Sequence, residues 1–125
     1  MKTFKTFTLL AALSLLSPTY VSANSALNAK TKAAADTTIN KAQEALGLLE
    51  KGGDNDHVLE LLGEVRQSQK DFRYEQTERL RQKAGDNLKY ARAELEKGDT
   101  TAAINHLKLT LDQYKEMLTI YNSAH

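Results

Sequence analysis

The stretch from Glu94 to Leu118 constrains the fold more than any other part of the sequence, because it combines a helix end, a polar turn and a second helix. Gly98 follows the last periodic apolar residue, Leu95, and glycine readily adopts the left-handed conformation that ends many helices. Asp99 then offers a side-chain oxygen to the free N–H groups of the next helix. The stretch therefore predicts a two-helix hairpin.

A second stretch, 46 positions earlier, carries the same pattern, with Glu50-Lys51-Gly52 in the place of Glu96-Lys97-Gly98. The gapless shift also superposes apolar residues: Ala45 on Ala91, Leu49 on Leu95, Val58 on Ile104, Leu61 on Leu107, Val65 on Leu111 and Phe72 on Leu118. Self-similarity at a fixed period is typical of a structural repeat. We therefore predict two similar helical hairpins.

Apolar residues recur at three- and four-residue spacing in four segments, which places them on one face of each of four helices. These faces are Ala35, Ile39, Ala42, Leu46 and Leu49; Val58, Leu61, Leu62, Val65 and Phe72; Thr77, Leu80, Ala84, Leu88, Ala91 and Leu95; and Ala103, Ile104, Leu107, Leu111, Tyr114, Leu118 and Tyr121. The simplest product is an all-α, antiparallel up-down-up-down four-helix bundle over residues 36–125, with Asp36 capping the first helix.

The turn between the second and third helices is open to two interpretations, because no helix breaker lies between Gly63 and Gly85. The repeat places this turn near Arg73 to Glu75, and the third helix then runs from Gln76 to Lys97. In the alternative, the second helix continues without interruption to a break at Gly85.

The N-terminus has the features of a signal peptide over residues 1–23. Lys2 and Lys5 form a basic start, an apolar run follows from Phe7 to Leu16, and Val21-Ser22-Ala23 fits the small-residue cleavage pattern. The run is shorter than the roughly 20 residues of a membrane-spanning helix, which disfavours a retained anchor. Residues 24–35, polar and rich in alanine, are expected to form a flexible leader. The predicted localisation is periplasmic or secreted, without stable membrane insertion after cleavage.

Composition excludes several classes of function. Without Lys2 and Lys5 the 17 basic residues fall to 15, against 16 acidic residues, a net charge of −1 that gives no electrostatic case for nucleic acid. Cysteine is absent, so neither a disulfide nor a c-type haem attachment is possible. Because no hydroxyl is paired with a histidine and an acid, and no phosphate-binding glycine loop is found, an enzyme is not expected.

The candidate metal ligands lie on the second and fourth helices. His57, Glu60 and Glu64 share one flank of a helix, and an imidazole beside carboxylates binds borderline divalent metals. Under the 46-residue shift, His106 falls on the position of Glu60 and becomes a fourth candidate. The metals that this ligand set favours are Cu, Ni and Zn. The alternative is a solvated flank without metal, because these side chains lie off the apolar face.

A basic segment from Arg66 to Arg92 contains eight basic and four acidic residues, with Phe72, Tyr74 and Tyr90 among them. Such a segment indicates either a surface for a partner or an anion, or a solvated helix face with internal ion pairs. Met117 is interpreted as packing at the edge of the core, since His106 lies 11 residues away on the same helix, about 16 Å by helical rise, and cannot share an iron with it.

Two stretches, INKAQEALGLLEKGGDNDHVLELLGEV and LKYARAELEKGDTTAAINHLKLTLDQY, resemble the small metal-binding protein family of periplasmic four-helix bundles. The likeness rests on alanine and leucine spacing and on the Lys-Gly-polar turn; cytochrome b-type bundles and tetratricopeptide hairpins are similar to a lesser degree. Members of the family are histidine-rich, whereas this chain has only His57, His106 and His125. The resemblance therefore implies the fold more strongly than the metal function.

These observations predict an exported, non-enzymatic binding protein that binds or buffers divalent metal weakly. The competing hypothesis is a metal-free module for protein interaction or envelope-stress protection, with another periplasmic protein as its partner and the surface from Tyr74 to Arg92 as its contact region.

Overall fold

The computed structural model describes residues 19–125, of which residues 19–25 are described by their helical backbone alone. The chain divides into two compact units, residues 1–30 and 31–125. Within the described part, four α-helices and one 3₁₀ turn form, and no strand is found: α2 (Thr19–Glu50), α3 (Asn55–Gln69), η1 (Glu75–Thr77), α4 (Glu78–Glu96) and α5 (Thr100–Ala124). The helices of the second unit pack as a bundle. Residues 1–18 of the predicted signal peptide lie outside the described residues.

Helix α2 begins earlier than the sequence pattern predicted. The flexible leader was expected over residues 24–35, yet α2 runs through it without interruption from Thr19. Asp36, the predicted N-cap, lies inside the helix and pairs with Lys32 one turn before it, at 3.6 Å. Alanine is the strongest helix former, and Ala34 and Ala35 are buried in the bundle, so these residues extend the helix beyond its expected start. No described helix has the length and apolar character required to cross a membrane.

Both hairpin turns close by the same hydrogen-bond pattern, the Schellman motif. Gly52 and Gly98 take the left-handed conformation, with φ of 73° and 83°. In the first turn the N–H of Gly53 donates to the carbonyl of Leu48, and in the second the N–H of Asp99 donates to that of Glu94, at 2.7 and 2.8 Å. The side chain of Asp54 caps α3, and that of Asp99 caps α5. The predicted turns are therefore confirmed.

The link between α3 and α4 resolves the two interpretations of the middle turn. Helix α3 ends at Gln69, and η1 leads into α4 at Glu78, so the turn lies near Arg73 to Glu75 as the repeat predicted. Gly85 lies inside α4 and breaks no helix.

The core consists of the apolar faces predicted for the four helices. Nearly all of the predicted residues are buried, and Leu46, Leu80, Ile104 and Leu118 pack against them at the edge. Met117, predicted at the edge, is instead fully buried. Buried polar residues interrupt the faces at four positions: Thr38, Gln69, Thr77 and Thr110.

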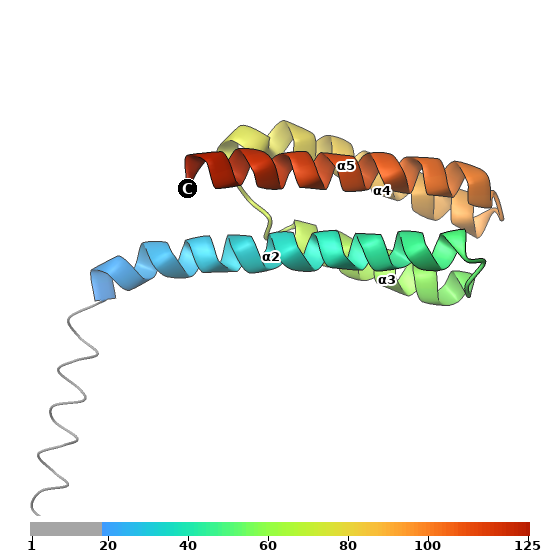
Figure 1. Cartoon of the computed structure of the whole chain (residues 1–125), viewed down its shortest axis with the longest axis horizontal. Coiled ribbons are helices and arrows are strands. Elements are labelled where there is room, and N and C mark those ends of the chain that lie inside the picture. The colour runs from blue at the N-terminus through green and yellow to red at the C-terminus, as the bar shows by residue number, and fades with distance from the viewer. Residues whose placement is uncertain (1–18) are drawn as a thin grey trace, which may run out of the picture. The chain divides into compact units, whose positions relative to one another are not determined.

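Within residues 31–125, Figure 1 shows α2 beside α3 and α4 beside α5. Side-chain contacts close a ring of neighbours: Thr38 of α2 shares a hydrogen bond with Ser68 of α3 (2.8 Å), Glu50 of α2 pairs with Lys108 of α5 (3.6 Å), Asn87 of α4 donates to Gln113 of α5 (3.0 Å), and Gly85 of α4 faces Gln69 of α3. Helices α3 and α5 therefore lie diagonally opposite each other in the bundle.

The two hairpins do not superpose with one constant shift. The helix-ending glycines, Gly52 and Gly98, are 46 positions apart, but the N-caps Asp54 and Asp99 are only 45 apart, because the second turn is one residue shorter. At a shift of 45, buried residues of α3 and of the link after it match buried residues of α5: Val58 with Ala103, Leu62 with Leu107, Val65 with Thr110, Gln69 with Tyr114, and Phe72 with Met117. The gapless shift of 46 thus holds only for α2 and α4.

Candidate functional site

Three of the predicted metal ligands lie on the exposed flank of α3. His57 and Glu60 are exposed near the start of the helix. Glu64, one turn further on, forms an ion pair with Lys41 of α2, with its oxygen 3.5 Å from the Lys41 Nζ. A metal at Glu64 would therefore compete with a lysine that this carboxylate already faces.

The fourth predicted ligand, His106, lies on α5 and faces α4. Its Nδ1 is 2.7 Å from a carboxylate oxygen of Glu94, and its ring lies 5.5 Å from that of Tyr90. The corrected shift of 45 matches His106 with Leu61 and not with Glu60. The repeat argument for joining His106 to the α3 residues was therefore wrong.

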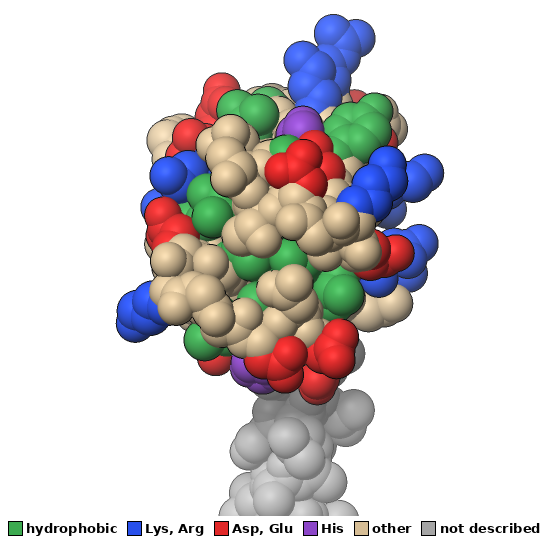
Figure 2. Space-filling model, turned by 90° about the vertical axis from the view of Figure 1, so that its right-hand side faces the viewer, with side chains coloured by type: hydrophobic (Ala, Val, Ile, Leu, Met, Phe, Trp, Pro, Cys, Tyr) green, Lys and Arg blue, Asp and Glu red, His purple; other side chains and the backbone are tan. Residues whose placement is uncertain are grey.

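The structure does not gather the four predicted ligands into one site. Among the described residues, no three His, Asp or Glu side chains are close enough to hold a metal together. His57 and His106 lie on the diagonal helices α3 and α5, which the core separates. Figure 2, a view onto one end of the bundle, shows histidine side chains at two separate places, each beside acidic side chains.

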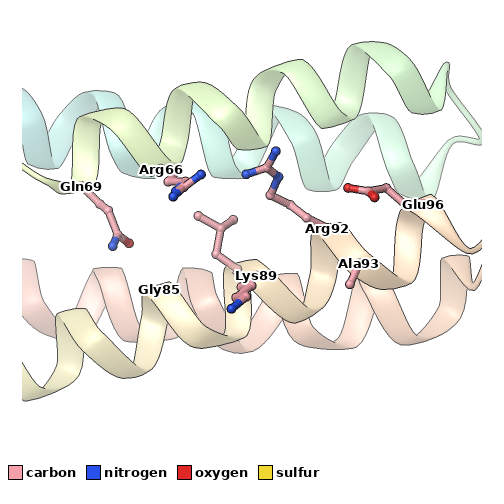
Figure 3. A pocket seen from close by; sticks show the side chains of 8 residues that line it. Arg66, Gln69, Gly85, Lys89, Arg92, Ala93 and Glu96 are labelled. Carbon is pink, nitrogen blue, oxygen red and sulfur yellow. The ribbon is translucent and has the colours of Figure 1, made fainter.

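A cleft of about 440 Å³ opens between α3 and α4. It is called the donor cleft below and is defined by Arg66, Gln69, Gly85, Leu88, Lys89, Arg92, Ala93 and Glu96. Figure 3 shows Arg66 and Gln69 extending from α3, and Arg92 extending from α4, into the space between the two helices. The cleft lies inside the basic segment that the sequence pointed to.

Arg92 has a buried donor without an acceptor. Its Nε is shielded from solvent, and no hydrogen-bond partner for it exists among the described residues. A buried donor left unpaired costs about 1–3 kcal/mol, and more when the group is charged. Native proteins rarely retain such a group.

Gln69 supplies a second donor, and Tyr114 fixes its orientation. Tyr114 is fully buried, and its hydroxyl donates to the Oε1 of Gln69. Burial raises the pKa of Tyr114 well above its usual value, against a smaller lowering by Arg81, so the hydroxyl keeps its proton. Because Oε1 is occupied by Tyr114, the amide of Gln69 turns its Nε2 donor to the cleft and to Gly85.

Gly85 makes room for this amide. A Cβ at position 85 would lie 3.0 Å from the Nε2 of Gln69, closer than almost all real Cβ contacts. Glycine inside a helix costs about 1 kcal/mol relative to alanine. The close approach of Gln69 gives a physical reason for a glycine in the middle of α4.

The cations of the donor cleft have no carboxylate partner among the described residues. In the described part of the chain, Arg66, Lys89 and Arg92 form no ion pair. By contrast, Arg73 and Arg81 at the other end of the segment both bind Glu78, at 2.8 and 2.7 Å. Within the basic segment, Arg73 and Arg81 thus differ from the cations of the donor cleft in having a carboxylate partner.

The lining of the donor cleft is dominated by hydrogen-bond donors. Its lining carries N–H donors from two arginines, a lysine and an amide, against the single carboxylate of Glu96. Such a set matches the oxygens of a carboxylate or phosphate. The sequence pattern indicated the basic segment but not Gln69. A glutamine on the apolar face of α3 was nevertheless a signal of a buried polar group.

Comparisons with protein-family models, with curated proteins and with solved structures found no match.

Proposed function

We propose that this chain is an exported, non-enzymatic binding protein whose donor cleft holds a small oxyanion. The observation that carries the proposal is the donor-rich lining of the cleft, in which Arg66 and Arg92 form no ion pair with any described residue. An oxyanion in the cleft would accept hydrogen bonds from these guanidinium groups and balance their charge. Export to the periplasm is supported by the signal-like residues 1–23 of the sequence.

The proposed architecture is the up-down-up-down order of four antiparallel helices. It is supported by the two short turns and by the ring of contacts from α2 through α3 and α4 to α5. In this arrangement the donor cleft lies between the two hairpins, so a ligand would contact both.

The test is calorimetric titration of the purified chain with butyrate and with ethyl phosphate at low ionic strength. At least one of these anions is expected to bind. Arg92→Gln is expected to weaken that binding roughly 10- to 100-fold, the value of a buried hydrogen bond to a charged group. Arg66→Gln, on the exposed edge of the cleft, is expected to weaken it less.

Arg79→Gln is the matched control, because Arg79 is an exposed arginine of the same helix outside the cleft. It is expected to leave the affinity unchanged. The proposal is wrong if neither anion binds, or if Arg79→Gln weakens binding as much as the two cleft variants do.

A second candidate function, weak divalent-metal binding, is favoured by the pair of His106 and Glu94. A carboxylate at Nδ1, as here at 2.7 Å, favours the tautomer in which Nε2 carries the lone pair that a metal needs. Binding at one imidazole is weak and suits buffering by separate surface histidines, His57 among them, with Cu, Ni or Zn. In a calorimetric titration with Cu(II), His106→Ala is expected to remove one part of the binding heat and His57→Ala another part. Heat that neither substitution changes would exclude these sites.

A further inference from the structure

The donor cleft carries its positive charge in the middle and a negative charge at one end. Gln69, Arg66 and Arg92 supply donors over most of its length, and Glu96 closes the other end. Glu96 is exposed and, like the cationic side chains, forms no ion pair within the described residues. Arg92 and Glu96 are four residues apart on α4, which places them about 6 Å apart along the helix axis.

The cleft is larger than a bare oxyanion requires. Its volume of about 440 Å³ leaves room beside the few atoms of an oxyanion. Part of the lining is apolar and belongs to Leu88, Gly85 and Ala93. A ligand that fills this space therefore needs a short apolar body in addition to its anionic group.

From these features we infer that the ligand is a small zwitterion, with an oxyanion at Arg66 and Arg92 and an ammonium group at Glu96. The inference rests on the proposed oxyanion function and adds the second charge and the spacing. A carboxylate with a terminal amine and a phosphate ester of an amino alcohol share this chemistry.

The experiment compares matched ligands by calorimetry at low ionic strength. The carboxylate pair is 4-aminobutyrate against butyrate, and the phosphate pair is O-phosphoethanolamine against ethyl phosphate; butylamine carries the cation alone. Within the pair that binds more tightly, the zwitterion is expected to exceed the simple anion by roughly three- to fivefold, as one partly exposed ion pair allows. The stronger pair identifies the oxyanion as carboxylate or phosphate.

Glu96→Gln is expected to abolish this preference while leaving the affinity for the simple anion at least as high. Glu116→Gln, an exposed glutamate of α5 outside the cleft, is the control and should retain the preference. Equal binding of zwitterion and simple anion, or a preference that survives Glu96→Gln, would overturn the inference and leave the oxyanion function standing. Tighter binding of butylamine than of any anion would contradict both, as would no binding at all.

Discussion

Tyr114 of α5 donates its buried hydroxyl to Gln69 at the end of α3, across the core of the bundle. This bond joins the two hairpins and determines which atom of the Gln69 amide faces the donor cleft. Because the hydroxyl is fully buried, it depends on Gln69 for its partner. One hydrogen bond therefore serves both the packing of diagonal helices and the arrangement of donors in the candidate site.

Tyr114→Phe is expected to lower the free energy of unfolding by about 1–2 kcal/mol, because it leaves the Gln69 carbonyl without its donor. It should also weaken oxyanion binding, since the amide is then free to rotate. Urea unfolding and the butyrate and ethyl phosphate titrations measure the two effects. Tyr90→Phe, at a tyrosine that is 54% exposed, is the control and should change neither. If Tyr114→Phe leaves the free energy of unfolding unchanged, the hydrogen bond makes no net contribution to stability.

Gly85→Ala is expected to behave unlike alanine at other helical glycines. Its new Cβ would lie 3.0 Å from an amide that Tyr114 holds in place, whereas a Cβ at Gly63 in α3 would meet no atom within 4 Å. Gly63→Ala should stabilise the chain by up to about 1 kcal/mol. Gly85→Ala should lose most or all of that gain and weaken oxyanion binding. Equal stabilisation of both variants in urea unfolding would contradict the close packing of Gln69.

The turns were predictable because their causes are local. A helix end at which the chain reverses direction requires a residue in the left-handed conformation and a side-chain oxygen that caps the next helix. Gly98 and Asp99 supply these at two adjacent positions. The buried faces followed in the same way from helical spacing. The start of α2 was not predictable from its cap, because a helix that begins further upstream needs no cap at Asp36.

The register of the repeat depends on the length of each turn, and the donor cleft depends on which helices pack together. The spacing of apolar residues along the sequence gives neither. A turn shortened by one residue changes which residues of α3 and α5 correspond, and so the gapless match of His106 to Glu60 failed. Arg66 and Arg92 line one cleft only because α3 and α4 pack side by side. Two residues in the sequence are unusual for their positions and belong to the cleft. Gln69 is a glutamine on an apolar face, and Gly85 is a glycine within a helix that it does not break.

Leu107→Asp is expected to unfold the chain, because Leu107 is fully buried and an unpaired charge in the core costs more than a small domain can lose. Leu107→Ala should fold with a loss of about 2–5 kcal/mol. Leu109, two positions further along α5, is 52% exposed, so Leu109→Asp should stay within about 0.5 kcal/mol of the parent. Circular dichroism melts compare the three. A cooperative melt in Leu107→Asp would contradict the assigned core.

Glu78 is expected to make stability depend on pH in the acid range. Its carboxylate accepts hydrogen bonds from Arg81 and Arg73, and these outweigh desolvation and lower its pKa below the ordinary 4.5. A lowered folded-state pKa gives stability that is fully present above the unfolded value and is lost as the pH falls through the folded value. The side chain is 28% exposed, so solvent screening limits the contribution to about 0.5–1 kcal/mol.

The comparison of parent and Glu78→Gln in urea unfolding tests this. At pH 7 the free energy of unfolding of the variant should be lower by about 0.5–1 kcal/mol, and this difference should shrink as the pH is lowered from 4.5 toward 3. Glu75→Gln, at an exposed glutamate of η1, is the control and should show no such trend. A difference that stays constant over this range would mean that the ion cluster at the start of α4 contributes nothing to the pH dependence.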